Sequence, residues 1–167
     1  MSKSHLIRKY RAVDRDQCRT LWKKLTEWHR QIYQDPSIGG AHPEEYFDKH
    51  LAKAGPERLW VAVQDSKVVG LAGLIVNGKE AEIEPVIVSE HYRRRKIGKD
   101  LLQEVLKEAR RLRVRFLNVS PVARNIDAVR FFYGQGFKNL GHIGLFIDLS
   151  ECTWKQGPKL FECQFSF

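Results

Sequence analysis

The sequence predicts an α/β fold with a mixed central β-sheet and flanking helices. Its 167 residues fit one domain at the usual roughly 100 to 200 residues per domain. Short β-branched apolar runs alternate with amphipathic helical patterns, and a strand–helix–strand succession in the middle of the chain is typical of a parallel pair. No internal repeat or linker interrupts these patterns, so we expect a single domain.

The first part of the chain is expected to form a strand and two helices. A strand is predicted over His5–Ala12, and apolar residues at helical spacing predict a helix from Asp14 to about Tyr33. Pro43, followed by two acidic residues, predicts the start of a second helix, which Gly55-Pro56 ends.

A three-stranded antiparallel meander and a long helix are predicted next. The strands are expected over residues 59–64, 68–76 and 81–88, with Asn77-Gly78 as the hairpin turn before the third. A helical pattern from Ile97 to Leu112 and a short strand over Phe116–Ser120 follow. Together they complete a β–α–β unit.

The last part is predicted to contain one helix and two strands. The helix runs from about Asn125 to Gln135, and the strands cover Leu140–Leu149 and Lys159–Phe167. The expected order of elements is therefore β α α β β β α β α β β.

Composition points to an ordinary protein of the cytoplasm. The longest apolar run, Val68–Val76, is about half of the ~20 residues that cross a bilayer, and the first residues lack the apolar stretch of a signal peptide. Cys18, Cys152 and Cys163 are odd in number and lack C-x-x-C spacing, so reduced thiols are expected. The histidines show no paired ligand spacing, and we expect neither a metal site nor membrane binding.

Positive charge is concentrated around the long helix. The segment Arg93–Arg115 holds ten basic and three acidic residues and so carries +7 of the net charge of +9. Five of its basic residues crowd the start of the helix, where the helix dipole favours acids: Arg93, Arg94, Arg95, Lys96 and Lys99. A strand, a basic loop and Gly98 at a helix start predict a phosphate-binding turn, and a solvated basic face is the alternative.

Two motifs resemble the GNAT family of N-acetyltransferases. Arg93-Arg-Arg-Lys-Ile-Gly98 resembles its acetyl-CoA loop, Gln/Arg-x-x-Gly-x-Gly/Ala, with Lys96 where the first glycine is expected. The segment from Asn125-Ile-Asp-Ala128 to Gly136-Phe137 resembles a second motif, N-x-x-A followed by aromatic residues and G-F. The element order is also similar to the GNAT fold, which implies one GNAT domain over residues 1–167. Neither a P-loop nor a G-x-G-x-x-G fingerprint is present.

The resemblance implies acetyl-CoA as the cofactor and a set of residues that bind it. In this family the pantetheine arm pairs with the strand before the loop, the pyrophosphate lies on loop amides, and the motif asparagine contacts the cofactor. The implied residues here are Val86, Ile87, Val88, Arg93, Arg94, Arg95, Lys96, Ile97, Gly98, Lys99 and Asn125. Pro85, which has no N–H, marks a bulge or an edge in that strand.

Acetyl transfer to an amine needs a proton acceptor, an oxyanion donor and a group that protonates the leaving thiolate. Glu82 and Glu84 alternate with apolar residues and are expected to share a strand face with Val86 and Val88, so either could be the base; a solvated strand face is the alternative. The N–H of Val88 is the expected oxyanion donor. Family members often carry, at the position of Phe132, a tyrosine that protonates the leaving thiolate, so Tyr133 is the candidate for that role here. For both Phe132 and Tyr133, packing in the core is the alternative.

We therefore expect an acetyl-CoA-dependent N-acetyltransferase that transfers acetyl directly to a primary amine of a small molecule or a peptide. The loop Tyr33–Gly40 and the segment around Trp154 are expected to line the acceptor site. One alternative is a non-catalytic acyl-CoA-binding or regulatory protein. Another is nucleic-acid binding through Arg110, Arg111, Arg113 and Arg115. The apolar carboxyl-terminal strand offers a route to a homodimer.

Overall fold

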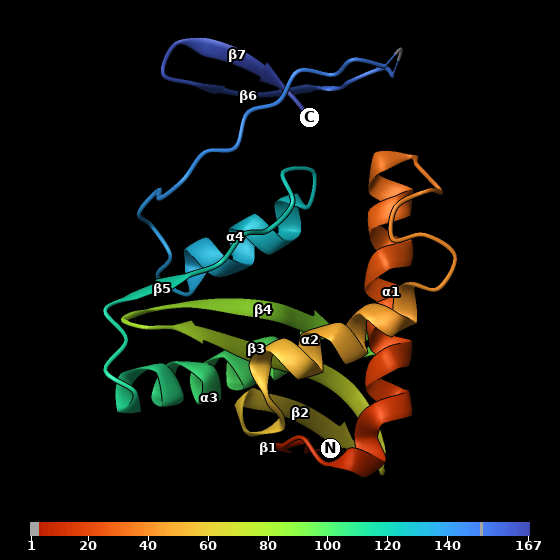
Figure 1. Cartoon of the computed structure of the whole chain (residues 1–167), viewed down its shortest axis with the longest axis vertical. Coiled ribbons are helices and arrows are strands. Elements are labelled where there is room, and N and C mark those ends of the chain that lie inside the picture. The colour runs from red at the N-terminus through yellow and green to blue at the C-terminus, as the bar shows by residue number, and fades with distance from the viewer. Residues whose placement is uncertain (1–3, 151) are drawn as a thin grey trace. The chain divides into compact units, whose positions relative to one another are not determined.

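The computed structural model describes residues 4–150 and 152–167 (Figure 1). The chain divides into two compact units, residues 1–120 and 121–167, and each is described by itself. The elements of the first unit are β1 (Leu6–Lys9), α1 (Arg15–Tyr33), α2 (Tyr46–Ala54), β2 (Leu59–Gln64), β3 (Lys67–Asn77), β4 (Glu80–Val88), α3 (Ile97–Arg111) and β5 (Phe116–Asn118). Those of the second are α4 (Ile126–Gly134), β6 (Gln156–Leu160) and β7 (Cys163–Ser166). The predicted α/β class is confirmed, and the predicted order of elements is confirmed as far as α4.

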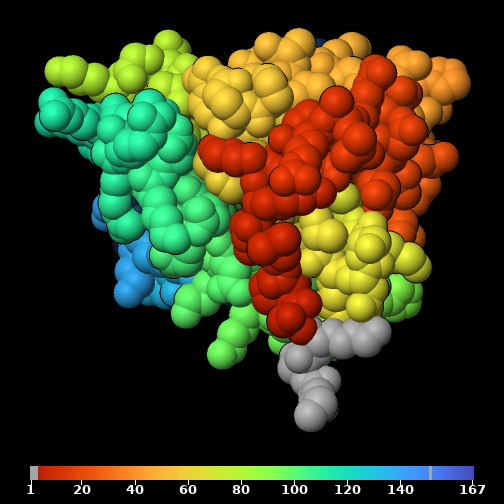
Figure 2. All heavy atoms as spheres, turned by 90° about the horizontal axis from the view of Figure 1, so that it is seen from below, coloured from red at the N-terminus to blue at the C-terminus, as the bar shows by residue number. Residues whose placement is uncertain are grey.

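The first unit is built on a five-stranded sheet in the order β1-β2-β3-β4-β5. The pairs from β1 to β4 are antiparallel, and β4 and β5 are parallel, as the β–α–β pattern predicted. Helix α3 covers one face of the sheet, and α1 and α2 cover the other (Figure 1). Figure 2 shows the amino-terminal residues, in red, running between α3, in green, and the β2–β3 hairpin, in yellow.

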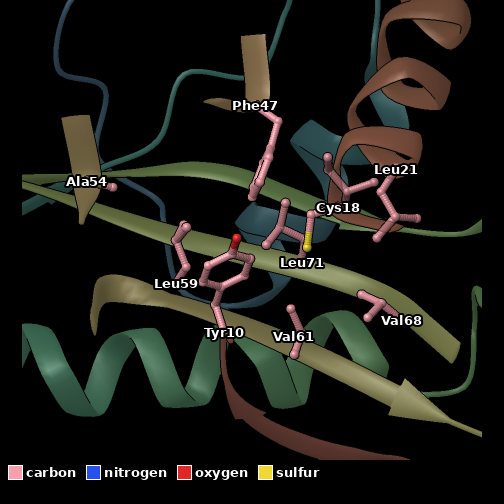
Figure 3. Packing of buried hydrophobic residues seen from close by; sticks show 10 residues of the cluster. Tyr10, Cys18, Leu21, Phe47, Ala54, Leu59, Val61, Val68 and Leu71 are labelled. Carbon is pink, nitrogen blue, oxygen red and sulfur yellow. The ribbon is translucent and has the colours of Figure 1, made fainter. Parts of the chain in front are cut away.

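A core of apolar side chains fills the space between the sheet and helices α1 and α2 (Figure 3). Cys18 and Phe47 from the helices are fully buried against Leu59 and Leu71 from the strands. Burial raises the pKa of the Cys18 thiol to about 12, so this thiol stays protonated and unreactive. Burying these side chains orders the helices on the sheet and so fixes where their polar residues lie.

The ion pair between Arg8 and Asp14 anchors the start of α1 to β1. Two guanidinium nitrogens of Arg8 donate to the carboxylate of Asp14 at 2.7 and 2.8 Å, and the Arg11 N–H donates to it as well. Burial works to raise the pKa of Asp14, but these hydrogen bonds outweigh it and hold the pKa below its ordinary value.

Strand β4 contains a bulge at Glu84 and Pro85. Leu74 of β3 pairs with Ile83 and Ala72 pairs with Val86, so two steps along β3 match three along β4. The extra residue shows that Pro85 marks a bulge, one of the two possibilities that the sequence left open. The bulge also moves the side chains beyond it to the opposite face of the sheet.

The expectation that Val86 and Val88 share a face with the glutamates is therefore wrong. Glu82 pairs with Ile75, which packs against the core under α1 and α2. Val88 pairs with Gly70, whose missing side chain would point at Leu101 and Ile97 of α3. The glutamates thus lie on the α1 and α2 face, and Val86 and Val88 lie on the α3 face.

The two predicted carboxyl-terminal strands are misplaced. Residues 140–149 form no strand, and apolar side chains that favoured one are exposed: Ile147 by 85% and Leu149 by 94%. The predicted single strand Lys159–Phe167 is instead a hairpin of β6 and β7, which turns at Phe161 and Glu162. Both residues have positive φ, at 51° and 64°, and neither is a glycine or asparagine that would signal such a turn.

Gly73 lies opposite the bulge, and an alanine there should be costly. Its Cβ would collide with the carbonyl oxygen of Glu84 and lie 2.7 Å from Nε2 of His50. We predict that Gly73→Ala lowers the free energy of unfolding by about 1–3 kcal/mol, measured by urea denaturation. Gly134→Ala is the control, because its Cβ would meet no atom within 4 Å. Equal stability of the Gly73 variant and wild type would contradict the close packing at the bulge.

Candidate active site

The segment between β4 and α3 folds into a tight bend. The Tyr92 N–H donates to Ser89 O at 2.8 Å and the Arg93 N–H donates to Glu90 O at 3.1 Å, which turns the chain sharply after the strand. Arg94 and Lys96 then take left-handed conformations with φ of 60° and 65°. These turns bring the chain directly to the amino-terminal end of α3.

The start of α3 presents unpaired backbone donors and positive charge. Its first helical hydrogen bond runs from Asp100 N to Lys96 O at 3.0 Å, so the N–H groups of Ile97, Gly98 and Lys99 precede the helical ladder. Arg94, Arg95, Lys96 and Lys99 are exposed around this end. Asp100, the acidic residue of the first turn, is hydrogen-bonded to Nε2 of His5 at 2.8 Å. The arrangement is a suitable site for an anion.

Among the residues that the structure describes, no strand pairs with the outer edge of β4 beyond its first three residues. Strand β5 pairs with β4 only from Glu80 to Glu82. Further along, the Ser89 N–H donates to Val69 O of β3 at 2.8 Å. Because backbone groups alternate along a strand, the N–H and C=O groups of Val86 and Val88 point away from β3, whereas those of Ile87 point toward it. Of the three strand residues, Val86 and Val88 can therefore offer backbone hydrogen bonds to a ligand.

Arg93 differs from the other basic residues of the bend, because its side chain turns back onto the protein. Its Nε donates to Val88 O at 3.2 Å. Its guanidinium carbon lies 5.6 Å from the ring centroid of Trp28 in α1, a cation–π contact. Arg93 therefore connects the end of β4 with α1.

Glu82 and Glu84 lie on the α1 and α2 face, and each contacts a polar side chain of the first unit. Oε1 of Glu82 accepts a hydrogen bond from Ser120 Oγ at 3.0 Å. Oε2 of Glu84 lies 3.9 Å from Lys53 Nζ of α2. Both carboxylates keep partial exposure, so a ligand can reach them from the α2 side.

Residues 22–137 match the model of the acetyltransferase (GNAT) family. The chain belongs to this family. No curated protein sequence matches it.

Solved GNAT structures share the fold. The PaiA N-acetyltransferase of Thermoplasma acidophilum, in complex with coenzyme A, is 21% identical with a TM-score of 0.70, over 84% of this chain and 94% of that one. A GNAT acetyltransferase of Staphylococcus aureus Mu50 is 17% identical with a TM-score of 0.69, over 83% and 87%. The glucosamine-6-phosphate N-acetyltransferase of Arabidopsis thaliana is 15% identical with a TM-score of 0.62, over 89% and 100%.

The GNAT family uses acetyl-CoA, and the residues of this chain fit that cofactor. The diphosphate of the cofactor needs backbone donors and positive charge, which the start of α3 provides. Its extended pantetheine arm, which carries amide groups, needs a free strand edge, which Val86 and Val88 provide. Among the described residues, no helix has the length and apolar character to span a membrane.

The second GNAT motif lies in the unit formed by residues 121–167. Asn125 is the N-cap of α4, and its side chain accepts from the Ala128 N–H at 3.2 Å. Phe132 is buried against Phe131 and Phe137, which confirms the core reading for Phe132. Tyr133 is 59% exposed. The roles of Asn125 with the cofactor and of Tyr133 as an acid stay predictions.

His50 is a polar residue of this region that sequence reasoning missed. It is 5% exposed, packs against the ring of Trp22, and has no hydrogen-bond partner for Nε2 among the residues that the structure describes. Burial, aided by Lys53, lowers the pKa of His50 to about 4. Helical spacing with Phe47 and Ala54 could have indicated its burial, but no sequence signal reveals the missing partner.

Replacing Lys96 by the glycine that the family motif carries should not lower the stability of the protein. The left-handed conformation costs an L-residue roughly 1–2 kcal/mol, and glycine avoids that cost while losing more chain entropy on folding. We predict that Lys96→Gly leaves the free energy of unfolding unchanged or raises it by up to about 1 kcal/mol. In contrast, Lys99→Gly, inside the helix, should lower it by about 1 kcal/mol. Equal losses in urea denaturation would contradict the strain at Lys96.

His50 should make the protein acid-sensitive. An unfolded histidine takes up a proton near pH 6.5, whereas folded His50 does so near pH 4. Between these values the unfolded chain binds more protons, so stability falls as the pH falls from about 6.5 to 4. We predict that the melting temperature falls further between pH 7 and pH 4.5 in wild type than in His50→Phe. His29, whose pKa burial also lowers, is common to both proteins. Equal losses would contradict the buried neutral imidazole.

Proposed function

We propose that this GNAT protein is an N-acetyltransferase that transfers the acetyl group directly from acetyl-CoA to a primary amine of a small molecule or a peptide. The observation that carries the proposal is the open edge of β4, which ends at the basic bend and has glutamates on the adjoining face. The named N-acetyltransferases among the structures of the same fold support it.

The cofactor is held by backbone groups more than by side chains. Both backbone groups of Val86 pair with the pantetheine arm, the N–H of Val88 is kept for the thioester, and the amides around Gly98 bind the diphosphate. Arg94, Arg95 and Lys99 supply positive charge, which strengthens those hydrogen bonds. When bound, acetyl-CoA supplies the activated acetyl group as a thioester.

Two groups of the first unit promote the transfer. Glu84 accepts the proton of the attacking amine, because it lies nearer than Glu82 to the end of β4 where the cofactor binds. The N–H of Val88, which points away from β3, donates to the thioester oxygen as negative charge develops there. Tyr133 is the candidate to protonate the leaving thiolate, which is a good enough leaving group for water to serve instead. No covalent enzyme intermediate is needed.

The acceptor reaches the glutamates from the side of α1 and α2. The loop after α1 is shaped by Arg30, which donates to Ile38 O at 2.8 Å and to Gly40 O at 2.6 Å. This loop is our proposal for part of the acceptor-binding surface. Location in the cytoplasm, a homodimer and a contribution from the segment around Trp154 stay predictions.

Calorimetry with coenzyme A, followed by thiol release over a panel of amines, tests the function. Gly98→Leu should weaken coenzyme A binding at least tenfold, about 1.4 kcal/mol, because its side chain blocks close approach to the helix start. Lys107→Ala, an exposed change toward the far end of the same helix, should bind as wild type does. Tight binding without acetylation of any amine would favour the non-catalytic alternative.

The base assignment predicts a pH-dependent loss of turnover. Glu84→Gln should lower kcat about 100-fold at pH 7 and much less at pH 10, where the amine loses its proton without help. Glu80→Gln, on the same strand face but further from the cofactor, should keep wild-type turnover. An equal loss in the Glu84 variant at every pH would exclude a role as base.

A further inference from the structure

The side chain of Arg93 makes different contacts from those of the basic residues beside it. Arg95 and Arg93 both lie near an aromatic ring, but the partner of Arg95 is Tyr92 within the bend, at 5.4 Å. The partner of Arg93 is Trp28 of α1, and its Nε also donates to the backbone of β4. We infer that Arg93 is a positioning residue that fixes the end of β4 against α1, and that it leaves the phosphates to Arg94, Arg95 and Lys99. This inference rests on the proposed function.

A chain of hydrogen bonds carries the positioning effect. Arg93 Nε donates to Val88 O at 3.2 Å, and the N–H of the same peptide unit, that of Ser89, donates to Val69 O of β3 at 2.8 Å. A charged donor on the carbonyl polarises the peptide and strengthens the bond that its N–H makes. Arg93 therefore holds the end of β4 onto β3.

The same contact determines which backbone groups a ligand can use. The carbonyl of Val88 points to the open edge of β4, and Arg93 already occupies it. The N–H of Val88 and both backbone groups of Val86 remain for the pantetheine arm and the thioester. The pantetheine arm is thus kept in one register along β4, because a register in which it hydrogen-bonds to the Val88 carbonyl would have to displace Arg93.

Trp28 extends this arrangement to the acceptor side. It is half-buried on α1, the helix that leads into the loop proposed to bind the acceptor. A planar guanidinium can lie over the ring while its Nε donates to the strand, which a lysine cannot do. Arg93 therefore ties the strand that binds the thioester to the helix on the acceptor side.

Coenzyme A affinity distinguishes positioning from phosphate binding. The variants are Arg93→Gln, Arg93→Lys and the matched control Arg95→Gln, each measured by calorimetry at low and high salt. We expect Arg95→Gln to weaken binding about fivefold and to reduce its salt dependence, as loss of a charge on a phosphate does. Both Arg93 variants should stay within about twofold of wild type with unchanged salt dependence, yet lower kcat about tenfold, because lysine does not restore the planar contact.

Hydrogen exchange of the protein without ligand gives a readout that does not need turnover. The Ser89 amide should exchange about tenfold faster in Arg93→Gln than in wild type, and Trp28→Leu should speed it in the same direction. Arg95→Gln should leave it unchanged. Combining Trp28→Leu with Arg93→Gln should add little to the single changes, because both remove one contact.

Two results would overturn the inference. The first is that Arg93→Gln weakens coenzyme A and flattens its salt dependence as much as Arg95→Gln does. The second is that Ser89 exchange is the same in wild type and in both Arg93 variants. If wild type acetylates no amine, the proposed function fails, while affinity and exchange still decide the role of Arg93.

Discussion

The site depends on one constraint: each backbone N–H and C=O in a sheet needs a partner. Strand β4 satisfies this on the side of β3 before and after its bulge, but on the other side β5 pairs with it from Glu80 to Glu82. Beyond that point, among the described residues, no strand pairs with both backbone groups of Val86 or with the N–H of Val88, whereas Arg93 donates to the Val88 carbonyl. Leaving such groups without a partner costs free energy, which is why we propose that a ligand with amide groups along its length binds there as an added strand does.

The bulge at Glu84 and Pro85 divides β4 into two parts whose side chains face opposite sides of the sheet. Before it, the glutamates face α1 and α2, where Lys53 and Ser120 contact them. After it, Val86 and Val88 turn their side chains to α3, which begins at the basic bend. In the proposed function the acceptor and the cofactor therefore approach the strand from different faces. They meet at its edge, where the N–H of Val88 points outward.

The sequence predicts elements well where hydrophobic period and turn residues agree. The bounds of β2 are as predicted, and Asn77-Gly78 correctly marks the hairpin before β4. The basic bend at the start of α3 lies where the sequence predicted it, and phosphate binding there stays a prediction, which rests on basic residues being locally unfavourable at a helix start without an anion. The sequence does not reveal on which face of the sheet Val86 lies. Pro85 indicates a bulge or an edge, but it does not show that one extra residue moves the side chains beyond it to the opposite face. The turn at Phe161 cannot be predicted, because its residues are not types that favour a turn. Contacts between residues far apart in the sequence, such as Arg93 with Trp28, leave no local sequence pattern.

Amide hydrogen exchange with and without coenzyme A tests the central claim most directly. In the free protein the amide of Ile87, paired with β3, should be protected, and those of Val86 and Val88 should exchange rapidly. Saturation with coenzyme A should slow Val86, saturation with acetyl-CoA, which brings the thioester oxygen, should slow Val88 as well, and Ile87 should stay as it was. If both valine amides exchange at the same rate with and without the bound ligand, the edge of β4 does not hold the cofactor.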